Sequence, residues 1–397
     1  MIRLMYQREA EKKIKDLAKK FPVLAVTGPR QSGKTTLVKA TFKNFAYFSL
    51  EDLDVRLQAK EDPRGFLSQN TDGMIIDEAQ HVPELFSYIQ TIVDKNQKMG
   101  QFILTGSQNF LLLEKISQSL AGRVGIIQLL PFSLKELHSI KEQGNDINFW
   151  IYRGFYPPIY DRKIPPIDFY PQYIQTYVDR DVRSLQNIFD LSTFQKFVKL
   201  CSGRIGNLLN INSLATDCGI SFNTAKSWLS LLEASYIIFL LKPHHINFNK
   251  RLTKHPKLYF YDTGLACSLL GIHDEEQVQT HYLRGALFEN LIIGEYIKSQ
   301  FNAGLPNNAF FWRDNTGNEI DLLIEKGGKA IPIEIKSGET LNSSFYDSLH
   351  YYSKLSEQDP SKAILFYGGD RTFSSQKGAT ISWKNLKKGF GKSIAEV

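Results

Sequence analysis

The chain has 397 residues, of which 42% are hydrophobic and 22% are charged, so it is long enough for two or three globular domains. No apolar run reaches the roughly 18 residues of a membrane span, and the first residues lack the apolar core of a signal peptide, so we expect a cytoplasmic protein. The net charge of +7 permits nucleic-acid binding without requiring it, and the three widely spaced cysteines indicate neither a disulfide framework nor a zinc knuckle.

The first part of the chain alternates between short apolar runs and longer segments without Gly or Pro, which is typical of an α/β fold with a parallel sheet. The apolar runs are predicted to be buried strands and the longer segments helices. In chain order we expect a helix at 3–20, strands at 23–27 and 45–49, helices at 51–60 and from 62, and strands at 73–78, 101–108 and 125–130.

The segment 28–36 fits G-x-x-x-x-G-K-[ST], the phosphate-binding loop of nucleoside triphosphatases, and it lies between a predicted strand and a predicted helix. Its glycines let backbone N–H groups point at the β-phosphate, where the helix N-terminus adds partial positive charge. Lys34 would bridge the β- and γ-phosphates of ATP, and the Thr35 hydroxyl would hold Mg²⁺. The residues expected to contact the nucleotide are Gly28, Pro29, Arg30, Gln31, Ser32, Gly33, Lys34, Thr35 and Thr36.

An apolar strand ending in Asp77-Glu78 delivers two carboxylates to the edge of the sheet where α/β proteins bind ligands. Asp77 would lie in the outer shell of Mg²⁺, and Glu78 could orient and polarise the attacking water, which favours hydrolysis over a kinase reaction. Ser107, at the tip of another strand, would sense the γ-phosphate or simply cap the strand. Arg123 is either a surface side chain or a phosphate-directed arginine, acting in cis or on a neighbouring subunit.

These motifs together resemble those of prokaryotic AAA-type ATPases that carry an uncharacterised C-terminal domain. The resemblance covers nearly the whole chain. It implies an AAA-like domain, a winged-helix segment and a C-terminal restriction-endonuclease-like domain. The motifs that carry it are 28–36, 76–80, 104–107 and 121–123, and further segments similar to this family are 177–181 and 257–266.

The middle of the chain is predicted to be largely helical, after turns at 154–158 and 164–166. Its range 214–241 has the layout of a helix-turn-helix followed by a wing strand, in which Ser221 caps the second helix. Only Lys226 is basic on the exposed face of that helix. The segment is therefore expected to contact phosphates or to pack against the protein, and not to read a DNA sequence.

Two strand-like runs near the C-terminus, at 318–325 and 330–336, are joined by a Gly-Gly pair at 327–328, which is a strong hairpin signal. The register that closes this hairpin places Asp321 directly opposite Glu334. Opposed like charges are destabilising unless something neutralises them. A divalent metal, Mg²⁺ or Mn²⁺, held by both carboxylates would do so.

Lys336 lies beside these acids and could polarise an attacking water, as in the restriction-endonuclease-like fold that this region resembles. In that fold a preceding helix adds a further acid, for which Glu289 fits, with Glu295 as the spare. Pro332 interrupts the second run and indicates an edge or a strand start there. The alternative is a hairpin of the same fold that has lost catalysis.

We therefore expect three domains: an AAA-like ATPase at 1–140, a helical linker and winged helix at 141–274, and a restriction-endonuclease-like domain at 275–397. The predicted function is Mg²⁺-dependent ATP hydrolysis acting on DNA, with metal-dependent cleavage left open. The alternative is an ATP-dependent switch that binds a protein partner and carries an inactive nuclease-like domain. The expected partners are ATP and DNA, without a membrane, and self-association into a homo-oligomer is left open.

Overall fold

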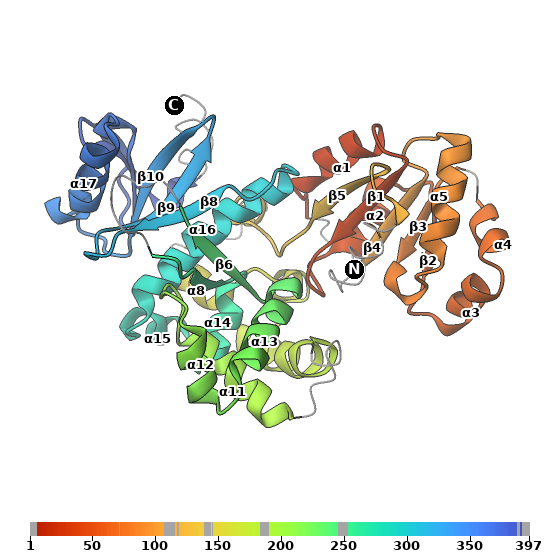
Figure 1. The fold of residues 1–397 in the computed structure, drawn as a ribbon, viewed down its shortest axis with the longest axis horizontal. Coiled ribbons are helices and arrows are strands. Elements are labelled where there is room, and N and C mark those ends of the chain that lie inside the picture. Colours follow the sequence, from red (N-terminus) through yellow and green to blue (C-terminus); the bar gives the residue numbers. More distant parts are fainter. Residues whose placement is uncertain are drawn as a thin grey trace.

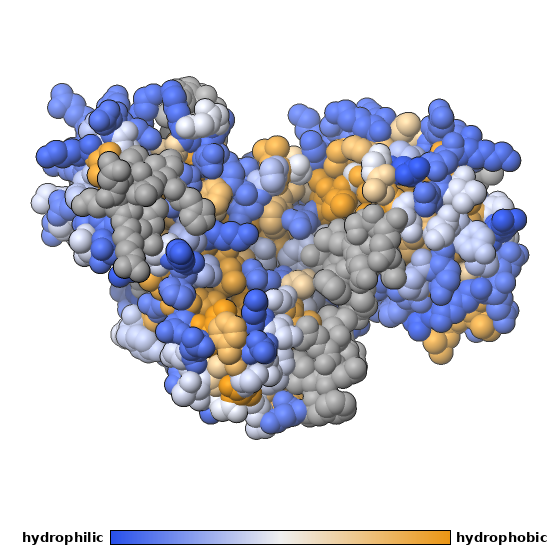
Figure 2. All heavy atoms as spheres, in the orientation of Figure 1, coloured by the Kyte–Doolittle hydropathy of each residue, from blue (hydrophilic) through white to orange (hydrophobic). Residues whose placement is uncertain are grey.

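The computed structural model describes residues 6–70, 72–106, 119–138, 146–182, 190–244 and 253–386, together with 116, 144 and 390, and only the backbone of 179–182. In Figure 1 the N-terminal sheet and its helices form a lobe at the right, the C-terminal strands form a lobe at the left, and the middle helices lie below and between them. Hydrophilic residues cover most of both outer lobes in Figure 2, and the hydrophobic residues that show lie mainly toward the middle of that view. Within the described ranges, no helix combines the length and apolar character that crossing a bilayer requires.

The N-terminal lobe is built on a five-stranded sheet with the order β2-β3-β4-β1-β5. All of its pairings are parallel, as the sequence predicted, and β4 lies between β1 and β3. The elements are α1 (Ala10–Ala18), β1 (Val23–Thr27), α2 (Lys34–Thr41), β2 (Ala46–Ser49), α3 (Leu53–Glu61), α4 (Pro63–Ser68), β3 (Met74–Asp77), η1 (Ala79–His81), α5 (Leu85–Asn96), β4 (Phe102–Gly106), β5 (Val124–Gln128) and α7 (Leu134–His138).

Both faces of this sheet are buried, because alternate residues of each strand point to opposite sides. On β1, Val23 and Ala25 pack in the cluster that contains α5, whereas Leu24 and Val26 pack in the cluster that contains α1 and α2. The continuous apolar run of β1, which the sequence analysis identified as a buried strand, is thereby explained. The α/β class with a parallel sheet is confirmed.

The middle segment is helical up to an antiparallel strand pair, β6 and β7. Its helix-turn-helix pair forms where the sequence predicted it, because Gly219 ends α12 with φ 79° and the Ser221 hydroxyl accepts the Thr224 N–H at 3.1 Å to begin α13. The elements are α8 (Ile147–Arg153), α9 (Pro157–Asp161), α10 (Pro166–Tyr173), the π-helix η2 (Ile174–Val182), α11 (Leu191–Ser202), α12 (Ile211–Cys218), α13 (Phe222–Ala234), β6 (Ile238–Pro243), β7 (Lys257–Phe260), α14 (Thr263–Leu270) and α15 (Glu275–Thr280).

The second sheet has eight strands in the order β12-β13-β11-β10-β9-β8-β6-β7, so β6 and β7 of the middle segment extend the C-terminal sheet through a parallel pairing of β6 with β8. The long helix α16 packs against one face of this sheet, and the shorter helix α17 packs against the other. The remaining elements are α16 (Arg284–Asn302), β8 (Ala309–Arg313), β9 (Glu319–Lys326), β10 (Lys329–Lys336), η3 (Ser343–Tyr346), α17 (Asp347–Ser356), η4 (Pro360–Lys362), β11 (Ile364–Tyr367), β12 (Phe373–Ser375), β13 (Gly378–Ser382) and η5 (Trp383–Asn385).

The β9–β10 hairpin has the predicted register, with Lys326 paired to Lys329 and Leu322 to Ile333. Both turn glycines have positive φ, 58° and 76°, as a tight two-residue hairpin turn requires. Pro332 is tolerated in β10 because the pairing with β11 begins only at the next residue, Ile333.

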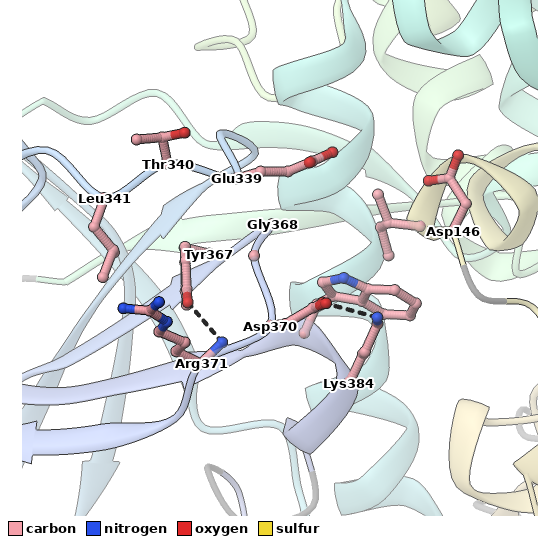
Figure 3. Close-up of a pocket in the computed structure, with 12 residues that line it drawn as sticks. Asp146, Glu339, Thr340, Leu341, Tyr367, Gly368, Asp370, Arg371 and Lys384 are labelled. Atoms are coloured by element: carbon pink, nitrogen blue, oxygen red, sulfur yellow. Dashed lines mark hydrogen bonds and ion pairs between the residues drawn. The ribbon is translucent and has the colours of Figure 1, made fainter.

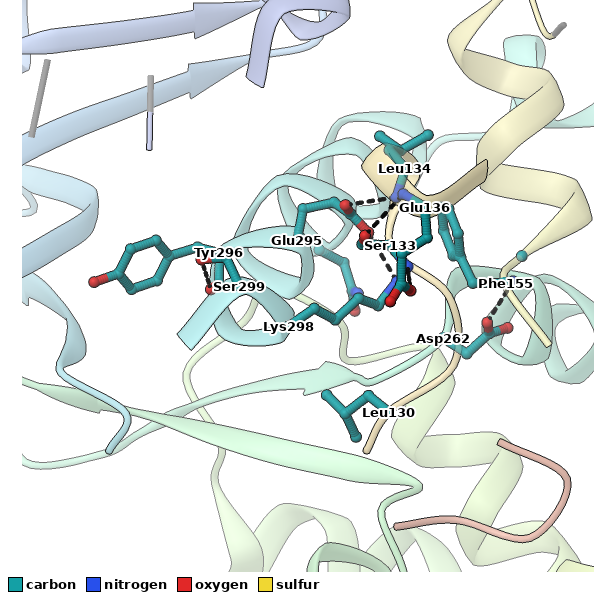
Figure 4. Close-up of polar contacts among 12 residues, drawn as sticks. Leu130, Ser133, Leu134, Glu136, Phe155, Asp262, Glu295, Tyr296, Lys298 and Ser299 are labelled. Carbon is teal, nitrogen blue, oxygen red and sulfur yellow. Dashed lines mark hydrogen bonds and ion pairs between the residues drawn. The ribbon is translucent and has the colours of Figure 1, made fainter. Parts of the chain in front are cut away.

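Helix α16 also contacts the N-terminal lobe through a buried polar cluster (Figure 4). Glu295 accepts the Leu134 N–H at 2.8 Å and is contacted by Lys298 Nζ at 2.8 Å. The same ammonium lies 3.6 Å from the centre of the Phe155 ring. Glu295 therefore serves this junction, which corrects its prediction as a spare metal ligand.

Candidate functional site

The phosphate loop connects the end of β1 to the start of α2. At Gly28, with φ 150°, a Cβ would lie 2.1 Å from the Leu129 carbonyl oxygen, and Gly33 has φ 92° directly before Lys34 begins the helix. Only glycine allows this backbone path. The predicted loop therefore has the strand and helix that its motif requires.

Asp77, at the end of β3, is the centre of the site. Its Oδ2 accepts hydrogen bonds from Thr35 Oγ1 at 2.9 Å and from the Tyr47 hydroxyl at 2.8 Å, and its Oδ1 accepts one from Thr105. The structure thus brings the predicted pair Thr35 and Asp77 together. Tyr47 and Thr105 were missed, although both lie on predicted strands that flank β3.

The Lys34 side chain is buried and donates to the Gly28 and Pro29 carbonyl oxygens at 3.0 and 2.9 Å. Burial lowers the pKa of its ammonium, whereas the carboxylates of Glu78 and Asp77 oppose that shift. Glu78 has a left-handed backbone, with φ 53°, which is uncommon for a residue other than glycine and concentrates at functional sites. The two carboxylates and the lysine therefore converge on the loop.

A cavity of about 770 Å³ adjoins the loop and is large enough for a nucleotide. Its lining includes the predicted residues Lys34, Thr35 and Glu78, and also the apolar Phe132 and Pro157, which follow the sheet in sequence. Also among its lining residues are Tyr6, Arg8, Arg30, Gln31, Gly33, Thr36, Leu37, Glu51, Asp77, Pro158 and Arg162.

A second cavity, of about 720 Å³, lies at the C-terminal ends of β10 and β11 (Figure 3). It is strongly polar: Lys384 Nζ pairs with Asp370 Oδ1 at 2.8 Å, and the Tyr367 hydroxyl accepts the Arg371 N–H at 2.8 Å. None of the predicted site residues is among the described residues that line it. Its size alone does not make it the functional site.

The structure corrects the in-cis prediction for Arg123, and Ser107 lies outside the described residues. Arg123 precedes β5, and its carbonyl oxygen accepts the N–H of Val23, the first residue of β1. The phosphate loop follows Thr27, the last residue of β1, at the other end of that strand. Its guanidinium pairs with Asp94 at 2.9 Å. Arg123 lies at the opposite edge of the sheet from the phosphates, so only a homo-oligomer could bring it to another subunit's nucleotide.

The predicted C-terminal acids also come together. Asp321 Oδ2 accepts the Ile335 N–H at 2.9 Å and lies 3.9 Å from Lys336 Nζ, which contacts Glu334 as well. Burial, followed by the charge of Asp321, raises the pKa of the Glu334 carboxyl well above its usual range. One Glu334 oxygen, Oε2, is buried without a hydrogen-bond partner within the described residues.

A second lysine that sequence reasoning missed enters this cluster from β7. Lys257, which is 3% exposed, lies with its Nζ 3.0 Å from Glu289 and in contact with Glu319. The Tyr259 hydroxyl also donates to Glu289, and burial raises the pKa of that carboxyl to about 7. Glu289 is thus held by Lys257 and Tyr259, and its role as a metal ligand stays a prediction.

The donor chemistry supports a metal in the C-terminal cluster only in part. Asp321 and Glu334 remain as a carboxylate pair with one unpartnered oxygen. Across the described ranges, however, no three His, Cys, Asp or Glu side chains are grouped so that they could hold a metal ion. In the structure Lys336 pairs with Asp321 and Glu334, whereas Lys257 pairs with Glu289.

The parallel sheet, the phosphate loop and the acidic end of β3 are together typical of P-loop nucleoside triphosphatases. Residues 20–138 match the AAA domain family. Residues 144–276 and 284–386 match two families that are each described as a domain of unknown function (DUF8612 and DUF4143).

The chain is similar over most of its length to two mycobacterial proteins. The uncharacterized protein Rv2008c of Mycobacterium tuberculosis is 29% identical over 374 residues, which cover 93% of this chain and 82% of that protein. The uncharacterized protein Mb2031c of Mycobacterium bovis has the same identity and coverage. Among solved structures, the Walker-type ATPase PABY2304 of Pyrococcus abyssi aligns with 67% of this chain and 96% of its own, at 15% identity and a TM-score of 0.42.

Proposed function

We propose that the protein hydrolyses ATP in a Mg²⁺-dependent reaction at the phosphate loop. The observation that carries this proposal is the 2.9 Å contact between the Thr35 hydroxyl and the Asp77 carboxylate, beside the buried Lys34. Hydroxyl and carboxylate oxygens are the ligands that Mg²⁺ prefers, so this donor set fits the ion. Thr35 would bind Mg²⁺ directly and Asp77 through its outer shell.

When bound, Mg²⁺ neutralises phosphate charge. The chain's own groups supply the rest. Lys34 adds positive charge beside the phosphates, and the loop N–H groups and the start of α2 orient them. Glu78 lines the same cavity and accepts a hydrogen bond from Gln80, so its carboxylate is positioned to orient a water and to take its proton.

ATP turnover and nucleotide affinity, measured side by side, test this proposal. Lys34→Ala is expected to abolish binding. Glu78→Gln is expected to keep binding and to lower turnover by about 100-fold or more, because general-base catalysis contributes about that much. The control is Glu84→Gln, an exposed acid outside the cavity. The proposal fails if wild type neither binds nor hydrolyses ATP, or if Glu78→Gln and Glu84→Gln turn over alike.

A second activity, metal-dependent cleavage of DNA, is favoured by one observation: the opposed pair Asp321 and Glu334, with an unpartnered oxygen and Lys336 beside it. The net charge of +7 is compatible with DNA as a partner. The test is nicking of supercoiled DNA in Mg²⁺ or Mn²⁺ by wild type and Asp321→Asn, with ATP turnover followed in parallel. Nicking that is lost in the variant would support this activity. If the protein does not cut DNA and DNA does not stimulate ATP turnover, the alternative function is favoured, in which ATP controls the binding of a protein partner.

A further inference from the structure

Several polar groups in and beside the phosphate loop contact side chains from outside residues 20–138. A phosphate loop works because its N–H groups point inward at the anion, so its carbonyl groups must point outward. A carbonyl oxygen that is turned away from the ligand and buried needs a donor, since leaving it unpaired is costly. Which residues donate to this loop therefore determines how firmly its binding conformation is held.

Arg8 is the first of these residues. Its Nη1 donates to the Ser32 carbonyl oxygen at 2.7 Å and its Nη2 to that of Leu130 at 2.7 Å, while its Nε pairs with Glu136 at 3.0 Å. The guanidinium thus fixes the loop to the strand exit after β5. Arg8 itself is 6% exposed, so these hydrogen bonds form away from water, and breaking one of them costs more stability than breaking an exposed one.

Tyr236 is the second, and it comes from the middle segment. It occupies the turn between α13 and β6, with φ 57°, and its hydroxyl lies 2.9 Å from Oγ1 of Thr27, the residue before Gly28. Both side chains are buried, with 3% and 0% exposed. Tyr173 of α10 also reaches the loop, with its hydroxyl 3.5 Å from the Arg30 carbonyl oxygen.

We infer that the middle segment, residues 144–276, regulates nucleotide binding: its docking through Tyr236 holds the loop in the conformation that binds phosphate. This inference rests on the proposed ATP site. The backbone that leads into the loop is constrained by a hydroxyl pair whose two members are 209 residues apart in sequence. By linkage, anything that undocks the segment weakens nucleotide binding, and bound nucleotide strengthens the docking.

The experiment is a double-mutant cycle on the hydroxyl pair: wild type, Thr27→Val, Tyr236→Phe and the double variant, each titrated with a fluorescent ADP analogue in Mg²⁺. Tyr236→Phe removes a hydroxyl, and Thr27→Val replaces one with a methyl group of similar size. We expect each single variant to bind about fivefold more weakly, which is the effect of one lost hydrogen bond. The double variant should bind no more weakly than the singles, because the bond can be lost only once.

Two controls separate the outcomes. Tyr296→Phe removes another buried tyrosine hydroxyl, bonded to Asn308 at 2.6 Å and far from the loop, and should leave affinity unchanged. Lys34→Ala should abolish binding. If wild type does not bind, the proposed function fails. If wild type binds and Lys34→Ala does not, but Tyr236→Phe and Thr27→Val bind within twofold of wild type, or their effects simply add, the inference is overturned and the ATP site stands.

Discussion

Replacing Lys298 by Met tests the buried junction between α16 and the N-terminal lobe. Met keeps most of the side-chain volume over the Phe155 ring but removes the ammonium that contacts Glu295. The two side chains are 3% and 7% exposed, so the variant leaves a buried carboxylate without its cation. Removing one partner of a buried ion pair costs about 3–5 kcal/mol. We expect the free energy of unfolding to fall by that amount near pH 8.

The loss should depend on pH. Burial already raises the pKa of the Glu295 carboxyl above its unfolded value, and the charge of Lys298 opposes that shift. Replacing Lys298 by Met therefore raises the pKa of Glu295 further. A carboxyl with a raised folded pKa is destabilising when ionised, so the stability of the variant falls as pH rises from about 4.5 through the folded pKa. The deficit against wild type should therefore be smaller at pH 5 than at pH 8.

Urea unfolding of wild type and Lys298→Met at pH 5 and pH 8 measures this effect, with the free energy taken from the first unfolding transition. Lys298→Met/Glu295→Gln should recover at least half of the loss and remove its pH dependence, because Gln still accepts the Leu134 N–H. Lys354→Met, at an exposed site on α17, is the control. A loss below about 1 kcal/mol, or one that is equal at both pH values, would refute the view that Lys298 neutralises Glu295.

Three further outcomes follow from the geometry. Tyr47→Phe removes a donor to Asp77, and we expect ATP turnover to need several-fold more Mg²⁺, checked by Mg²⁺ titration; an unchanged requirement would show that Tyr47 does not orient the carboxylate. Gly154→Ala places a Cβ 1.9 Å from the Tyr170 hydroxyl at φ 64°, so we expect a loss of at least about 2 kcal/mol in thermal unfolding, contradicted by a wild-type midpoint. Burial raises the pKa of Asp314, but hydrogen bonds to its carboxylate outweigh burial and hold that pKa at about 2. The stability that the ionised carboxylate gives the fold is therefore lost as the pH falls from about 4 to 2, and acid unfolding of Asp314→Asn should lack this pH-dependent loss.

Sequence alone determined the features that depend on neighbouring residues. The phosphate loop follows from glycine spacing between a strand and a helix, and the β9–β10 register follows from two glycines that close a tight turn. The strands of the first sheet were predicted because a buried parallel strand has a continuous apolar run. The pair Thr35 and Asp77 followed as well, since carboxyl ends of parallel strands meet at one edge. That same rule places Arg123, which precedes its strand, at the other edge.

Only the tertiary structure decided which distant side chains meet. Lys257 neutralises Glu289, and Tyr236 reaches the end of β1, although each lies in a segment whose periodicity indicates only a buried strand or turn. Glu295 and Glu289 are equivalent as acids on one predicted helix, yet one faces the N-terminal lobe and the other the C-terminal cluster. Periodicity records which face of an element is buried. It does not record what the neighbouring element brings to that face, because this depends on how the lobes pack.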